Sequence, residues 1–190
     1  MRRRFYVQHS YGEALYDQKS RRGFRTAFQI GSMKHFMNQL LVSDSFDVFL
    51  LEEAVISMAN TFTIDGHVNR DFFQSVDGGI PEGLFEFRPW GEIKGLCFDL
   101  IKGKRTPLFF RFTLQLMPDK AIALLRSKNC DVDPSLVKAL ALNIRYDGTK
   151  AVLTTATAYH TFLPSKEPDI IWDKALAAFL DREGIIYEIL

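Results

Sequence analysis

Apolar and polar residues alternate over two stretches of the chain, which predicts β-strands with one buried face. From Phe110 to Leu116 and from Leu140 to Tyr146 every second residue is apolar, and most residues between them are polar. This is the two-residue period of a half-buried strand. One face of these strands would join the core, and the other would carry Arg111, Thr113, Asn143 and Arg145.

A β-hairpin is expected over residues 140–162. Asp147-Gly148 directly follows the second alternating stretch, and both residues accept the positive φ angles that a two-residue turn requires. The segment after the turn is rich in Thr, Val and aromatic residues, which fit a pleated surface. A turn centred on Asp147-Gly148 pairs Ile144 with Ala151 and Leu142 with Leu153.

The spacing of apolar residues, together with capping and breaking residues, predicts the remaining elements. Helices are expected over 33–41 after Ser32 as N-cap, over 89–102, over 119–128, and from Pro168 to Gly184. The second of these would place Ile93, Leu96, Cys97, Leu100 and Ile101 on its buried side. Strands are expected over 26–30, 61–64 and 185–190, and β-branched residues favour a strand over a helix for 46–58. A short helix is expected after Asp133-Pro134, and residues 69–89 have the composition of a loop.

This order of elements predicts an α+β fold, a largely antiparallel sheet with packed helices. We expect a single domain over residues 26–190. Phe28 lies 82 positions before Phe110, and Asp65 lies 82 positions before Asp147. This spacing suggests an internal repeat of strand, helix, two strands and helix, with halves 26–103 and 107–190.

Composition limits the class of protein. A chain of 190 residues with 47% hydrophobic residues and 17 Phe can build one globular core. No apolar run approaches the roughly 20 residues that span a bilayer, and no secretory signal is recognisable. Cys97 and Cys130 are too few for a disulfide framework and lack zinc-finger spacing. We therefore expect a cytoplasmic protein without membrane contact, bound metal or cofactor.

The net charge of +1 conceals a basic N-terminus. Residues 1–25 contain seven Arg and Lys against two acidic residues, so their charge is +5 and the remainder carries −4. Such an extension can bind nucleic acid or another polyanion. The alternative is an extension that lies outside the folded domain.

Candidate catalytic groups are scattered. The four His residues have no metal-ligand spacing, and no nucleotide-binding or nucleophile motif is present. Carboxylates are dense between Asp44 and Asp71, so an enzyme with a carboxylate-based metal or acid/base site there is one alternative function. The members of this acidic group are Asp44, Asp47, Glu52, Glu53, Asp65 and Asp71.

Cations gather near the predicted alternating strands. Lys104 and Arg105 precede the first strand and Arg111 lies within it, while Arg145 and Lys150 flank the predicted hairpin turn. If the strands are neighbours, these residues form one basic surface that suits phosphate or carboxylate groups. A charged, solvated strand face that opposes unwanted strand pairing is the alternative explanation.

Four segments resemble a small family of uncharacterised proteins from clostridia-type Gram-positive bacteria. The segments are FMNQLLVSDSFD (36–47), TFTIDG (61–66), IKGKRTP (101–107) and LNIRYDG (142–148). The resemblance extends from about Thr26 to Leu190 and implies a bacterial, cytoplasmic protein, but no activity and no catalytic residue. Together with the charge pattern it leads us to expect a non-enzymatic protein that binds an anionic small molecule or a protein partner. A nucleic-acid accessory protein is a further alternative.

Overall fold

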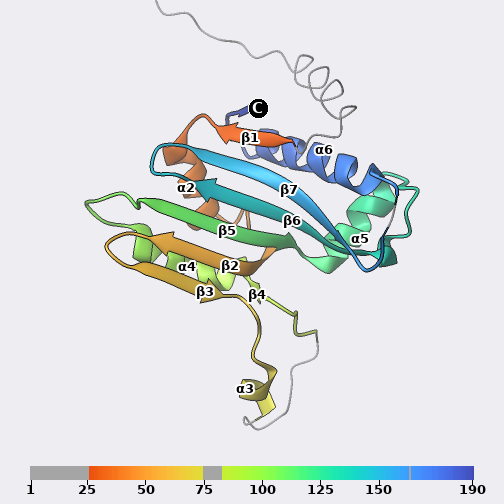
Figure 1. Ribbon diagram of the computed structural model, residues 1–190, viewed down its shortest axis with the longest axis horizontal. Helices are drawn as coiled ribbons and strands as arrows, with labels where there is room; N and C mark the ends of the chain where they lie inside the picture. Colours follow the sequence, from red (N-terminus) through yellow and green to blue (C-terminus); the bar gives the residue numbers. More distant parts are fainter. Residues whose placement is uncertain (1–25, 75–82, 163) are drawn as a thin grey trace, which may run out of the picture.

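The computed structural model describes residues 26–74, 83–162 and 164–190 (Figure 1). The basic extension expected over residues 1–25 and part of the loop expected over 69–89 lie outside the described residues.

The centre of the fold is one sheet in which every strand pairing is antiparallel. The strands follow the order β3-β2-β5-β6-β7-β1-β8, and the short β4 also pairs with β2 (Figure 1). Their bounds are β1 Ala27–Ile30, β2 Phe49–Ser57, β3 Thr61–Asp65, β4 Arg88–Pro89, β5 Phe109–Leu116, β6 Val137–Tyr146, β7 Ala151–Tyr159 and β8 Tyr187–Ile189.

Three helices, α2 Met33–Leu41, α4 Trp90–Ile101 and α6 Glu167–Arg182, pack on one face of this sheet. Helix α5 Pro118–Ser127 lies at one end of the sheet, and the short α3 Arg70–Gln74 lies away from it (Figure 1). A 3₁₀ turn is formed by Pro134–Leu136. The buried residues of α2, α4 and α6 belong to the same core cluster as the buried residues of the strands. The opposite face of the sheet carries the polar positions of β5 and β6 and is open to solvent, as one-sided antiparallel sheets commonly are. The predicted α+β fold is confirmed.

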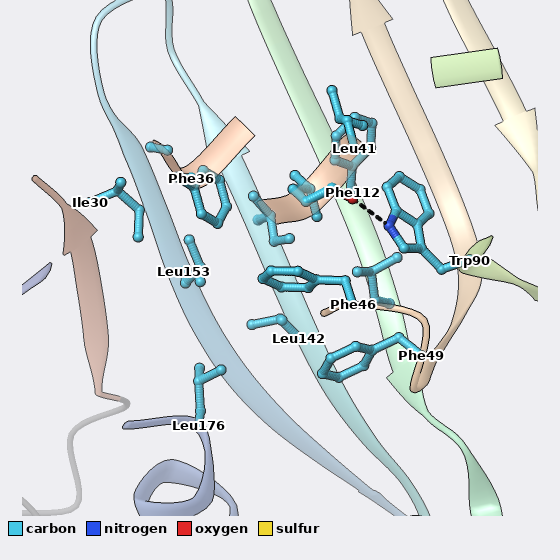
Figure 2. Packing of buried hydrophobic residues seen from close by; sticks show 14 of the residues in the cluster. Ile30, Phe36, Leu41, Phe46, Phe49, Trp90, Phe112, Leu142, Leu153 and Leu176 are labelled. Carbon is cyan, nitrogen blue, oxygen red and sulfur yellow. Dashed lines mark hydrogen bonds between the residues drawn. The ribbon is translucent and has the colours of Figure 1, made fainter. Parts of the chain in front are cut away.

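Aromatic side chains fill the space between the helices and the sheet. Figure 2 shows Phe46 and Phe49 lying against the strands of the sheet. The ring of Phe46 lies 5.0 Å from that of Phe179 in α6, and Trp90 in α4 lies 5.4 Å from Phe112 in β5. Full burial of each such side chain contributes about 1.5–3 kcal/mol. These contacts hold helices from distant parts of the sequence on one sheet.

β1, the first described strand, lies between β7 and β8 in the sheet. β1 pairs with β7 on one side and with β8 on the other. Below it, the buried Asp173 of α6 accepts hydrogen bonds from the hydroxyl groups of Thr26, at 2.8 Å, and Thr155. Residues far apart in the chain are therefore required for this part of the fold.

The hairpin turn lies one residue further along the chain than expected. Asp147 donates its main-chain N–H to the carbonyl of Lys150 at 3.1 Å, so Gly148 and Thr149 are the central residues. Ile144 consequently pairs with Leu153 rather than Ala151, and Leu142 pairs with Thr155 rather than Leu153. A shift of two in the pairing keeps every side chain on its expected face, because side chains alternate with a period of two.

Two other expectations need correction, and a third is not confirmed. Residues 70–74 of the expected loop form α3, and residues 88–89 form β4. On α4, Leu96 is exposed, whereas Trp90 and Cys97 supply the buried residues. Asp65 ends the second strand of its pair, whereas Asp147 lies between its two strands. The two aspartates are not in equivalent positions, and the internal repeat stays a prediction.

Within the described residues, each helix is too short or too polar to cross a lipid bilayer.

Candidate anion-binding surface

Two arginines face each other across neighbouring strands on the open face of the sheet. The alternating sequences of β5 and β6 put Arg111 and Arg145 on the face opposite the core, and strand register makes them direct partners. Side chains in such positions have Cβ atoms about 4.5–5.5 Å apart. Both side chains are exposed. The structure thus brings together two of the cations that the sequence singled out.

One carboxylate accompanies this pair. The guanidinium group of Arg111 binds the Glu53 carboxylate from β2, and both side chains are partly exposed. Among the described residues no carboxylate forms an ion pair with Arg145. The pair of arginines therefore retains about one uncompensated positive charge.

Lys150 lies beside these arginines at the hairpin turn. Its ammonium group donates to the Gln29 side chain of β1 at 3.2 Å, so the cation reaches across the first residues of β7 toward β1. The Asp147 carboxylate accepts hydrogen bonds from the main-chain N–H groups of Lys150 and Thr149, each at 2.9 Å. These bonds, together with one from the Thr149 hydroxyl, lower the pKa of Asp147 to about 2. The turn is therefore fixed by a carboxylate that is ionised at neutral pH.

Lys104 and Arg105 lie in the loop that enters β5, at the same end of the sheet (Figure 1). This loop touches the hairpin turn: a Cβ atom added to Gly148 would lie 3.0 Å from the carbonyl oxygen of Leu108. Both side chains are exposed. Lys102, by contrast, pairs with Asp99 at 2.6 Å and belongs to the end of α4. We name Lys104, Arg105, Arg111, Arg145 and Lys150 the basic end of the sheet.

The acidic group between Asp44 and Asp71 is divided between two places, although Glu53 and Asp65 are direct partners across β2 and β3. Asp44 and Asp47 bind the ammonium group of Lys94 on α4, at 3.1 and 2.7 Å. Burial disfavours the charged form of Lys94, but these hydrogen bonds outweigh burial and raise its pKa. Glu52 and Glu53 instead bind Gln115 and Arg111 from β5 on the open face.

Asp65 contacts a histidine on the surface. The Asp65 carboxylate accepts from the main-chain N–H of His67 at 2.9 Å and lies 3.0 Å from its Nδ1. These two bonds lower the pKa of Asp65. On the other side of the imidazole, Glu86 lies 3.8 Å from Nε2. All three side chains are more than half exposed, so the arrangement does not exclude water as an acid/base site would.

A second acidic group was missed from the sequence. Ligand atoms of Cys130, Asp131 and Glu167 lie within 4.8 Å of one another. Glu167 accepts a hydrogen bond from the main-chain N–H of Asp131 at 2.5 Å, across 36 residues of sequence. Burial, followed by the neighbouring carboxylates, raises the pKa of the Cys130 thiol. Nothing in the spacing of these residues could have revealed their proximity.

A groove of about 580 Å³ lies between α2 and α4, on the helical side of the molecule. Its lining includes the apolar residues Leu41, Phe98 and Ile101 and the cations Lys34 and Lys102. The sequence pattern did not indicate this groove, because a single sequence does not show which two helices lie side by side.

Comparison with known proteins gives a family but no activity. Residues 39–188 match a family of unknown function, DUF5721. The match begins within α2 and leaves out β1, although β1 is paired with two strands in the sheet. No curated protein and no solved structure matches the chain. Since the matched region includes most of the chain, the protein belongs to this family of unknown function.

Proposed function

We propose that this protein binds a phosphate-bearing ligand through the basic end of its sheet and is not an enzyme. The observation that carries the proposal is the direct pairing of Arg111 with Arg145 across β5 and β6. Like charges directly opposite each other destabilise a sheet. An anion bound between Arg111 and Arg145 would offset the repulsion between the two guanidinium groups.

The chemistry of the side chains supports a phosphate rather than an apolar ligand. Guanidinium groups bind phosphate and carboxylate oxygens in bidentate fashion. Arg145 has its donors free of any described carboxylate, and Arg111 shares its donors with Glu53 alone. The neighbouring Lys104, Arg105 and Lys150 would add attraction at longer range.

The shape of the surface supports binding rather than catalysis. The basic end is formed by exposed side chains on a sheet face and two connecting segments. Such a surface does not remove water from a reacting group, which catalysis commonly requires. We place this activity in the bacterial cytoplasm, as the family resemblance in the sequence implies.

The proposal is tested by titrating wild type and Arg111→Gln/Arg145→Gln with a panel of anions. The panel contains inorganic phosphate, a nucleoside triphosphate and a short single-stranded oligonucleotide, each measured by calorimetry at two salt concentrations. We expect the wild type to bind a phosphate-bearing member and the double variant to bind it at least about tenfold more weakly, the loss of one or two charge-assisted hydrogen bonds. The affinity should fall with added salt.

A matched control removes two positive charges elsewhere. Lys120→Gln/Arg126→Gln makes the same change in net charge on α5, at the opposite end of the sheet (Figure 1). If this control weakens binding as much as the double variant, only net charge matters and the proposed surface is wrong. If the wild type binds no member of the panel at millimolar concentration, the basic end is a solvated strand face. Tighter binding to the oligonucleotide, increasing with its length, would favour the nucleic-acid function.

A further inference from the structure

The outer edge of β3 is unpaired among the described strands. The sequence of β3 suits antiparallel pairing with β3 of a second copy of the chain. β3 is the terminal strand of the sheet and pairs only with β2 there (Figure 1). Exposed edges of this kind are usually protected by lysine, proline or a bulge. β3 reads Thr-Phe-Thr-Ile-Asp, so Asp65 at its end is its one charged residue.

The hydrogen bonds of β2 show which groups of β3 point outwards. Gly66 donates to the carbonyl of Glu52, whereas Leu108, which precedes β5, donates to the carbonyl of Ser57. Even-numbered residues of this part of β2 therefore bond toward β3, and odd-numbered residues bond toward β5. Because Ala54 pairs with Ile64 and Ile56 with Phe62, the main-chain groups of Phe62 and Ile64 are used internally. The N–H and C=O groups of Thr61, Thr63 and Asp65 point away from the sheet.

A twofold axis at Thr63 matches these outward groups to themselves. Antiparallel pairing of two β3 strands about Thr63 sets Thr63 opposite Thr63 of the second copy, and Thr61 opposite Asp65. The outward N–H and C=O groups of each copy then find their hydrogen-bond partners on the other copy. The Asp65 carboxylate meets the hydroxyl of Thr61, so no like charges oppose each other across the axis.

The same register pairs the apolar residues on the helical side of β3. Phe62, with 38% of its surface exposed, would lie opposite Ile64 of the second copy. Aromatic and β-branched side chains in such cross-strand positions stabilise a sheet. At the other edge of the sheet, pairing two β8 strands about Glu188 would place two carboxylates opposite each other. The register about Thr63 in β3 has no such repulsion.

We propose that two copies of this chain associate through β3 and form one continuous sheet with a twofold axis at Thr63. The contact is isologous and closes on itself, so it gives a dimer and not a filament. Five residues from each strand form its centre, and we expect a dimer that dissociates on dilution. The proposal is independent of the anion-binding surface.

Cysteine cross-linking tests the register directly. Thr63→Cys places two thiols opposite each other, with Cα atoms about 5.5 Å apart, within disulfide reach. Thr61→Cys, on the same strand and the same face, is the matched control, because the two introduced thiols would be separated by about 14 Å. On mild oxidation we expect a disulfide dimer from Thr63→Cys and none above the wild-type background from Thr61→Cys. Equal cross-linking of the two variants would overturn the proposal.

Charge variants test the interface without cysteine chemistry. Thr63→Lys sets two lysines opposite each other and should weaken dimerisation about tenfold. Thr61→Lys sets a lysine opposite Asp65 of the second copy and should preserve or strengthen it. Both are measured by sedimentation equilibrium from micromolar to millimolar chain concentration, with urea midpoints to verify that the monomer stays folded. A wild type that remains monomeric over this range overturns the proposal, as does a dimer that is insensitive to Thr63→Lys.

Discussion

The indole N–H of Trp90 donates a hydrogen bond of 2.8 Å to the main-chain carbonyl of Leu40, fifty residues earlier in the sequence (Figure 2). Leu40 lies in the last turn of α2, where main-chain carbonyl groups find no N–H donor within the helix. Trp90 begins α4, so the bond joins the end of one helix to the start of another inside the core.

Replacing Trp90 by Phe tests this junction. The variant keeps an aromatic ring but leaves the buried carbonyl of Leu40 without its partner, which costs about 1–3 kcal/mol of unfolding free energy. Urea denaturation measures the change. Leu96→Ala, at an exposed position of the same helix, is the control and should cost much less. Equal losses would show that the hydrogen bond contributes little.

Gly66 is required by a close approach of two chain segments. A Cβ atom at this position would lie 1.7 Å from the carbonyl oxygen of Leu51. Gly66→Ala must therefore separate the segment after β3 from β2, and we expect a loss of about 1–3 kcal/mol.

Gly95→Ala is the matched control for that substitution. Gly95 lies in α4, and a Cβ atom added there would have no neighbouring atom within 4 Å. Alanine at this position should stabilise the protein by about 1 kcal/mol, because it favours the helix. Thermal denaturation of both variants should thus show shifts of opposite sign, and two shifts in the same direction would contradict this account.

The hairpin turn gives a third prediction. Gly148 has a φ angle of +96°, and an added Cβ atom would lie 3.0 Å from the carbonyl oxygen of Leu108. Gly148→Val should cost about 1–3 kcal/mol through backbone strain. Gly103→Val, at a glycine with open space around it, should cost clearly less in the same denaturant titration. A larger loss at Gly103 would mean that the turn tolerates a side chain.

The Asp147 carboxylate makes the turn sensitive to acid. Its pKa is lowered from 3.8 to about 2 in the folded protein, mainly by the main-chain N–H of Lys150. The unfolded chain therefore binds the proton more readily, and the stability that Asp147 contributes is present above about pH 4 and is lost as the pH falls toward 2. Urea midpoints of wild type and Asp147→Asn should differ at pH 7 and converge at pH 2. A difference that is constant with pH would show that the charge is not involved.

The sequence pattern predicted which face each strand residue occupies better than how the strands are arranged. Alternation in β5 and β6 reflects burial on one side, and it placed Arg111 and Arg145 on the open face correctly. The turn was placed one residue early, because the Asp147 carboxylate binds the N–H groups of Thr149 and Lys150, and local residue preference does not reveal this. Contacts between distant segments, such as Lys94 with Asp47, have no signal in a single sequence.

The position of β1 has a consequence for synthesis of the chain. Among the described strands, β1 pairs with β7 and β8, which are synthesised after it because they begin at Ala151 and Tyr187. At roughly 5–20 residues per second, the nascent strand waits on the order of ten seconds for its first partner. The segment Ala27–Ile30 cannot form its native pairs during that time, and the main-chain bond from Leu190 to Ala27 forms only after β8 has been synthesised. A stalled or truncated chain would therefore expose the edge of β1 that β8 covers in the folded protein.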